Sequence, residues 1–171
     1  MANDCRTVFL SALLVLTVAC ASPPSEMAHL PMYGGMDRQA VPAFKSADEQ
    51  LIAGSMRAFG SRDNASDVSV DHGFKFVAQK EYSMAMKRFN QAWVLNPDNP
   101  QVYRGFGVVL VKRGQYCDAV PLLEKALSYK VAIDGLAAQT AQAYRACVET
   151  NTSLTPSEKA SYLDSARKLA E

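Results

Sequence analysis

Cysteine and histidine are the side chains of this sequence best suited to chemistry, and there are only four cysteines and two histidines. A thiol can be acylated beside a membrane, can form a disulfide, or can serve as a nucleophile or metal ligand. Cys20 follows an apolar run, whereas Cys117 and Cys147 lie far downstream. No histidine or acidic residue accompanies the downstream pair at ligand spacing, so we expect neither a metal site nor a catalytic thiol there.

The amino terminus has the pattern of a signal peptide. Residues 7–19 form an uncharged apolar run, which is too short to span a bilayer of about 30 Å comfortably. The run ends in Leu-Thr-Val-Ala-Cys at residues 16–20, which resembles the lipobox of bacterial lipoproteins. This resemblance implies a lipoprotein signal peptide over residues 1–19 and an acylated Cys20 that anchors the chain to a membrane.

The residues after Cys20 indicate which of the two membranes the lipid anchor enters. Ala21 and Ser22 lack the aspartate that retains enterobacterial lipoproteins in the inner membrane. By that resemblance we expect an outer-membrane anchor with the protein facing the periplasm; the alternatives are the inner membrane or a soluble periplasmic protein. An ordinary leader cleaved near Ala19 or Ala21, or an uncleaved anchor, also remains open.

A segment with no helical or strand period follows the leader. Residues 20–45 contain clusters of proline and glycine and are interpreted as a flexible tether; the pattern does not decide whether Met32 and Tyr33 dock on the domain. A helix is predicted over residues 46–59, because Ser46 and Glu49 match a capping box and apolar residues then recur at helical spacing.

Two downstream stretches align at a spacing of 34 residues. Small, aromatic and bulky positions repeat together, in the pairs Gly73/Gly107, Tyr82/Tyr116, Ala85/Ala119, Phe89/Leu123 and Ala92/Ala126. Such small residues suit places where antiparallel helices approach closely. A third, degenerate copy is predicted, with Ala141 at the glycine position and a last helix opened by Thr155 and Pro156.

A 34-residue helix-turn-helix period resembles the tetratricopeptide repeat (TPR) family. The resemblance implies an all-α, TPR-type helical solenoid of about three helix-turn-helix units plus a preceding helix, over residues 46–171. The repeats are expected at about 66–99, 100–133 and 134–171. The chain also resembles small TPR lipoproteins of Gram-negative bacteria.

This arrangement makes the downstream cysteines neighbours. Cys117 would begin the second helix of repeat two and Cys147 would end the first helix of repeat three, and these helices should run antiparallel and adjacent. In an oxidising compartment we expect a disulfide, which would stabilise the fold by about 3–4 kcal/mol in the chain-entropy model. The alternative is two buried thiols.

Signals for catalysis are sparse. The formal charge of +1 gives no field that favours nucleic acid, and no phosphate-binding loop, GxSxG or HExxH motif occurs. We interpret His72 as a core or boundary residue and the pair Asp48-Glu49 as part of a helix start. The chain is therefore expected to be no enzyme, to need no cofactor and to act on no small-molecule substrate.

Function is then expected to come from a surface. TPR arrays bind peptides in a concave groove lined by the first helix of each pair. The resemblance places these residues in the groove: Val70, Phe74, Val77, Gln101, Arg104, Val108, Val111, Lys112, Gln142 and Arg145. Arg104, Lys112 and Arg145 would make it mildly basic and suited to an acidic segment or a carboxylate, although the clamp of chaperone-binding TPR domains is not reproduced.

Three functions fit this interpretation. The first is an adaptor or assembly factor for an envelope complex, by resemblance to TPR pilotins that help secretin or pilus parts assemble. The second is an accessory subunit of a cell-wall enzyme. The third is a structural envelope lipoprotein without a dedicated ligand.

Overall fold

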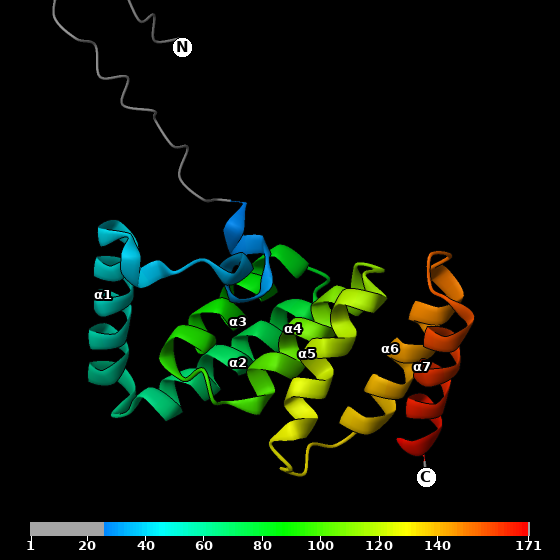
Figure 1. Cartoon of the computed structure of the whole chain (residues 1–171). Coiled ribbons are helices and arrows are strands. Elements are labelled where there is room, and N and C mark those ends of the chain that lie inside the picture. The colour runs from blue at the N-terminus through cyan, green and yellow to red at the C-terminus, as the bar shows by residue number, and fades with distance from the viewer. Residues whose placement is uncertain (1–25, 171) are drawn as a thin grey trace, which may run out of the picture.

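Seven α-helices and three short 3-10 helices make up the described part of the chain (Figure 1). The computed structural model describes residues 26–170, a range that contains no strand. The elements are η1 (Met27–His29), η2 (Pro31–Gly35), η3 (Arg38–Ala40), α1 (Pro42–Phe59), α2 (Arg62–Ala78), α3 (Tyr82–Leu95), α4 (Pro100–Lys112), α5 (Tyr116–Ser128), α6 (Leu136–Thr150) and α7 (Pro156–Lys168). The predicted signal peptide over residues 1–19 and Cys20 lie outside this range.

The helices stack in chain order as a helical repeat, which confirms the expected all-α class. Figure 1 shows α1 at one end, followed by the pairs α2–α3, α4–α5 and α6–α7. Each helix contacts the next along the chain, and the first helices of successive pairs also meet, α2 with α4 and α4 with α6. The first pair begins at residue 62, four residues before the predicted start. None of the helices in the described range is both long and apolar enough to cross a bilayer.

The helix ends follow from local capping chemistry. The Asn99 side chain accepts a hydrogen bond from the Gln101 amide at 3.0 Å, and Pro100 occupies the first turn of α4. Thr155 and Glu158 form a capping box at α7. These two predicted starts are therefore correct, because they depend only on residues adjacent in sequence.

Phe89 is the central side chain of the first interlayer contact. It is fully buried on α3, and its ring meets Phe74 edge-on at a centroid distance of 5.1 Å. A Cβ built on Gly73 would lie 2.5 Å from its Cε1 atom, and one built on Gly105 would lie 2.6 Å from its Cζ atom. Glycine is required at both positions because the ring occupies the space of a side chain.

We expect Gly105→Ala to lower the free energy of unfolding by about 1–3 kcal/mol, because overpacking outweighs the better helix propensity of alanine. The Phe89 ring has little room to move, since it is fully buried and also lies against Gly73. Gly54→Ala in α1 is the matched control: the nearest atom to its new Cβ is 3.9 Å away, so it should stabilise by about 0.5–1 kcal/mol. Urea denaturation of both variants measures the difference, and equal effects would contradict the packing argument.

Helix α1 begins earlier than predicted and for another reason. It starts at Pro42, with proline in its first turn, so Ser46 already lies inside the helix and the predicted capping box is absent. Asp48 does not cap: its buried carboxylate accepts hydrogen bonds from Arg38 Nε at 2.9 and 3.2 Å and pairs with the guanidinium. The tertiary ion pair replaces the local role that the sequence suggested.

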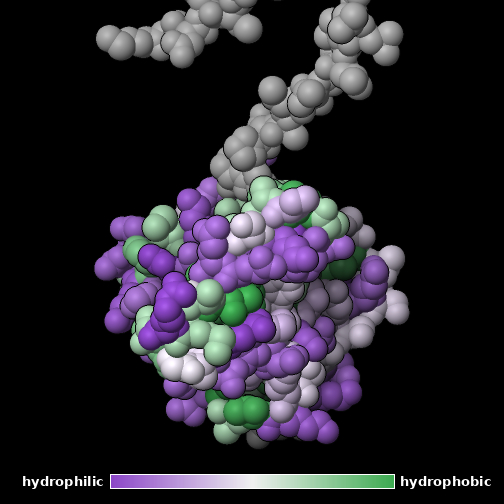
Figure 2. All heavy atoms as spheres, turned by 90° about the vertical axis from the view of Figure 1, so that its left-hand side faces the viewer, coloured by the Kyte–Doolittle hydropathy of each residue, from purple (hydrophilic) through white to green (hydrophobic). Residues whose placement is uncertain are grey.

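The outer side of α1 is largely polar (Figure 2), with a few apolar side chains left uncovered. Met56 and Phe59 are 46% and 42% exposed, so α1 is a loosely packed end of the stack. His72 is also exposed, on α2, which corrects its interpretation as a core or boundary residue. Its position on α2 turns it away from the neighbouring helices.

The predicted flexible tether over 20–45 is wrong for residues 26–45, which are folded. Residues 27–36, here called the strap, contact α3 through η1 and η2. Residues 42–45 belong to α1. Among the described residues that suggested a flexible linker, Pro31, Gly34 and Gly35 lie in the 3-10 helix η2, and the two glycines adopt left-handed backbone angles.

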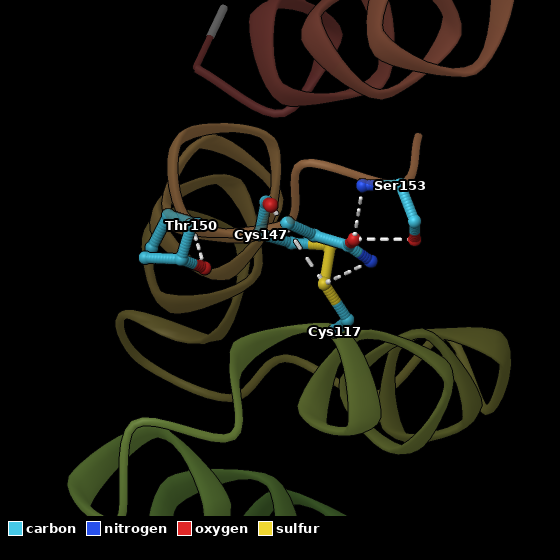
Figure 3. Close-up of a disulfide and its surroundings, with 6 residues drawn as sticks. Cys117, Cys147, Thr150 and Ser153 are labelled. Atoms are coloured by element: carbon cyan, nitrogen blue, oxygen red, sulfur yellow. Dashed lines mark hydrogen bonds between the residues drawn. A yellow bond between two sulfur atoms is a disulfide. The ribbon is translucent and has the colours of Figure 1, made fainter. Parts of the chain in front are cut away.

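A disulfide joins Cys117 and Cys147, as predicted from their places in the repeat (Figure 3). It links the first turn of α5 to the last turn of α6, with the two Cα atoms 4.8 Å apart. The Asn151 side-chain amide lies 3.6 Å from Cys117 Sγ. The disulfide therefore cross-links the third helix pair to the second.

Candidate functional site

The first helices of the three pairs form one continuous surface, here called the groove face, made by α2, α4 and α6. Two hollows lie along it. The first, of about 320 Å³, lies between α2 and α4 and is lined by Asp67, Val70, Asp71, Phe74, Gln101 and Arg104. The second, of about 120 Å³, is lined by Val108, Val111, Lys112, Leu123, Gln139 and Gln142.

The hollows bring most of the predicted groove residues together. Val70, Phe74, Gln101 and Arg104 line the first, and Val108, Val111, Lys112 and Gln142 line the second. Val77 and Arg145 line neither. Val77 lies one helical turn beyond Phe74 near the end of α2, and Arg145 is exposed on α6.

Two aspartates in the first hollow were missed by the sequence reasoning. Asp67 and Asp71 are one turn apart on α2, at helical spacing from Phe74, so this spacing was a usable signal. Asp67 accepts a hydrogen bond from the Asn99 side chain at 2.8 Å. Their presence corrects the expectation of a mildly basic groove, because the α2 side of the face carries carboxylates.

Arg104 is held in place between the two hollows. Its guanidinium lies over the Phe74 ring at 5.2 Å and donates to Gln139 at 3.1 Å and to Gln101 at 3.3 Å. These contacts direct it along the groove face and leave it unpaired with either aspartate. The Arg104 side chain therefore lies between the two hollows and separates them.

The strap occupies the opposite side of the stack. The fully buried Asn90 side chain of α3 accepts from the Tyr33 amide at 3.3 Å and donates to the carbonyls of Ala28 and Leu30 at 3.1 and 2.9 Å. Arg113 donates to the His29 carbonyl at 2.9 Å. The strap thus satisfies the amide of Asn90 and leaves the groove face uncovered.

We expect Asn90→Ala to detach the strap, because it would leave the Tyr33 amide and the carbonyls of Ala28 and Leu30 without partners, each at a cost of about 1–3 kcal/mol. Hydrogen exchange of residues 27–36 should accelerate by about tenfold or more. Asn64→Ala, at an exposed asparagine of α2, is the control and should leave exchange there unchanged. Unchanged exchange in Asn90→Ala would show that the strap is held by other contacts.

A third hollow, between α5, α6 and α7, contains a buried phenol. Tyr144 donates a hydrogen bond to the Glu124 carboxylate. Burial, together with that bond and the negative charge of Glu124, raises the pKa of Tyr144 to about 12. The hydroxyl is therefore protonated at neutral pH, and its hydrogen bond to Glu124 links α6 to α5. The role of Tyr144 is structural.

The raised pKa predicts a pH dependence of stability. Because the folded pKa of about 12 exceeds the ordinary value of 10.0, this stabilisation is complete below pH 10 and is lost as the pH rises through about 12. Tyr144→Phe should flatten that part of the profile of unfolding free energy against pH. A mutant profile parallel to that of the unaltered protein between pH 10 and 12 would rule out the link.

The described residues contain no cluster of three or more histidine, cysteine or acidic side chains placed to hold a metal ion. No protein-family model, curated protein or solved structure matches this chain. The fold and its surface define the class: an all-α helical repeat whose strap packs on α3 and whose first helices, α2, α4 and α6, form a hollowed face that no other described segment covers.

Proposed function

We propose that this chain is a lipid-anchored, periplasm-facing protein of TPR type that binds an extended segment of another envelope protein on its groove face. In this proposal it acts as an adaptor or assembly factor, without catalysis, cofactor or small-molecule substrate. The membrane anchor is the acylated Cys20, and the outer membrane is its site.

The observation that carries the proposal is the open groove face. Its two hollows have apolar floors, Val70 and Phe74 in one and Val108 and Val111 in the other, with charged residues at their rims. Helical repeats use such extended surfaces to bind peptides. The strap packs on α3 instead, so residues 27–36 do not occupy the groove face.

Site-specific photo-crosslinking in the native envelope tests this proposal. A photoreactive residue at Val108 should give a discrete adduct with one envelope protein. The same group at Lys87, exposed on α3, should not give that adduct. Identical adducts at both positions, or none at Val108, would contradict a binding role of the groove face.

The anchor is tested separately with a fatty-acid probe. The unaltered protein should incorporate the probe and fractionate with the outer membrane, whereas Cys20→Ala should do neither. Incorporation into Cys20→Ala would place the acyl group elsewhere.

A further inference from the structure

The charges of the groove face are segregated, and this arrangement restricts the chemistry of the partner. On the α2 side, the exposed carboxylate of Asp71 makes no hydrogen bond or ion pair with any other described residue. Towards the ends of α4 and α6, Lys112 and Arg145 are exposed and likewise have no carboxylate partner within residues 26–170. One end of the face is therefore acidic and the other basic.

The first hollow suits a cationic side chain. Val70 and Phe74 supply an apolar floor, and Asp67 and Asp71 supply two carboxylates at the rim. A lysine or arginine buries its aliphatic stem on apolar surface while its charged head stays beside carboxylates. Arg104 lies over the Phe74 ring at 5.2 Å, but its guanidinium is bonded to Gln101 and Gln139 and forms an ion pair with neither aspartate, so both carboxylates still lack a cation among the described residues.

The second hollow suits an uncharged apolar side chain. It is smaller, and Val108, Val111 and Leu123 line it. Lys112 stands at its rim, and Arg145 is on the adjacent α6. A carboxylate just beyond the apolar residue would therefore meet positive charge.

Helix dimensions fix the spacing between these features. The hollows lie on either side of α4, which separates them by about one helix diameter, roughly 10–12 Å. They are also offset along α4, because Gln101 and Arg104 line the first and Val108 and Val111 line the second, which adds about 10 Å along the helix axis. The combined separation is roughly 15 Å, and an extended chain advances about 3.3 Å per residue, so the two anchoring side chains stand about four or five positions apart.

We propose, on the basis of the function proposed above, that the partner is a bipolar extended segment. It carries a lysine or arginine for the α2–α4 hollow and an apolar residue about four or five positions away for the α4–α6 hollow. An aspartate, a glutamate or a terminal carboxylate follows beside Lys112 and Arg145. This differs from the acidic segment or carboxylate that the sequence suggested, because the partner also carries a cation.

Selection from a random 12-residue display library on the full chain in detergent tests the pattern. Enriched peptides should combine the cation, the apolar residue and the acid at this spacing. For the best peptide, measured by fluorescence anisotropy, Asp71→Lys and Lys112→Glu should each weaken binding by about tenfold. Asp134→Lys and Lys130→Glu, at exposed positions in the α5–α6 connection, are matched controls and should leave the affinity unchanged.

Charge exchange separates this inference from a general loss of binding. A peptide in which the cation is replaced by glutamate should bind Asp71→Lys more tightly than it binds the unaltered protein. Enriched peptides that lack a cation, yet lose binding when Val108 is replaced by glutamate, would overturn the bipolar pattern and leave the groove function intact. Absence of any peptide sensitive to Val108→Glu would overturn the inference, and crosslinking at Val108 would then decide whether the proposed function fails with it.

Discussion

Phe89→Ala should lower the free energy of unfolding by about 3–5 kcal/mol, the range typical of removing a fully buried phenylalanine. The ring is 0% exposed and contacts two other aromatic rings, with centroids 5.1 Å from Phe74 and 6.2 Å from Phe106. Collapse cannot fill the space, because Gly73 and Gly105 offer no side chains on either side. Urea denaturation followed by circular dichroism measures the loss.

Phe59→Ala provides the matched control for this prediction. Phe59 is 42% exposed at the end of α1, so its removal should change stability by less than about 1 kcal/mol. If both substitutions cost the same, Phe89 would not be the packing centre of the first two helix pairs.

The second large effect concerns the disulfide. Replacing Cys117 by serine and Cys147 by alanine should lower the free energy of unfolding by about 3–4 kcal/mol, because the bond closes a loop in the unfolded chain. The sequence separation of the cysteines is 30, which places the expected cost in the upper part of the typical range of about 2–4 kcal/mol. Thermal and urea unfolding of the double variant and of the oxidised protein give the difference.

Two further measurements make this test specific to the bond. A reducing agent should shift the midpoint of the unaltered protein towards that of the double variant and leave the variant unchanged. Hydrogen exchange should rise in α6 and α7 more than in α2 and α3, because the bond connects the third pair to the second. Coincident midpoints for the oxidised protein and the double variant would mean that the bond contributes no stability.

The repeat architecture was predictable because it depends on short-range patterns. The 34-residue pairing of Phe89 with Leu123 places each bulky side chain against a glycine of its own helix pair, Gly73 and Gly107 respectively. The turns also correspond: Lys80 has φ 62° where the next pair has Gly114 at φ 76°. The placement of Cys117 and Cys147 on facing helix ends followed from the same period.

The groove face was predictable only in outline. The resemblance to TPR repeats placed Val70, Phe74 and Arg104 in one groove, and the structure gathers them around one hollow. The charge of that hollow was not predicted, because Asp67 and Asp71 of α2 become part of it only where α4 packs beside them. The contacts of Arg104 with Gln139 join residues from different repeats and have no local signal.

The sequence by itself determined the helices, their pairing and the disulfide, because capping, periodicity and repeat spacing act within tens of residues. Only the tertiary structure decided that residues 27–36 fold onto α3 and that Asp48 pairs with Arg38. Those outcomes depend on Asn90, far along the chain, and on a buried carboxylate that needs a cation once it is removed from water. The physical reason is the sequence separation over which each interaction acts. Capping and helical periodicity join residues that are close in sequence. Burial joins groups that are far apart in sequence, and no spacing rule identifies such partners.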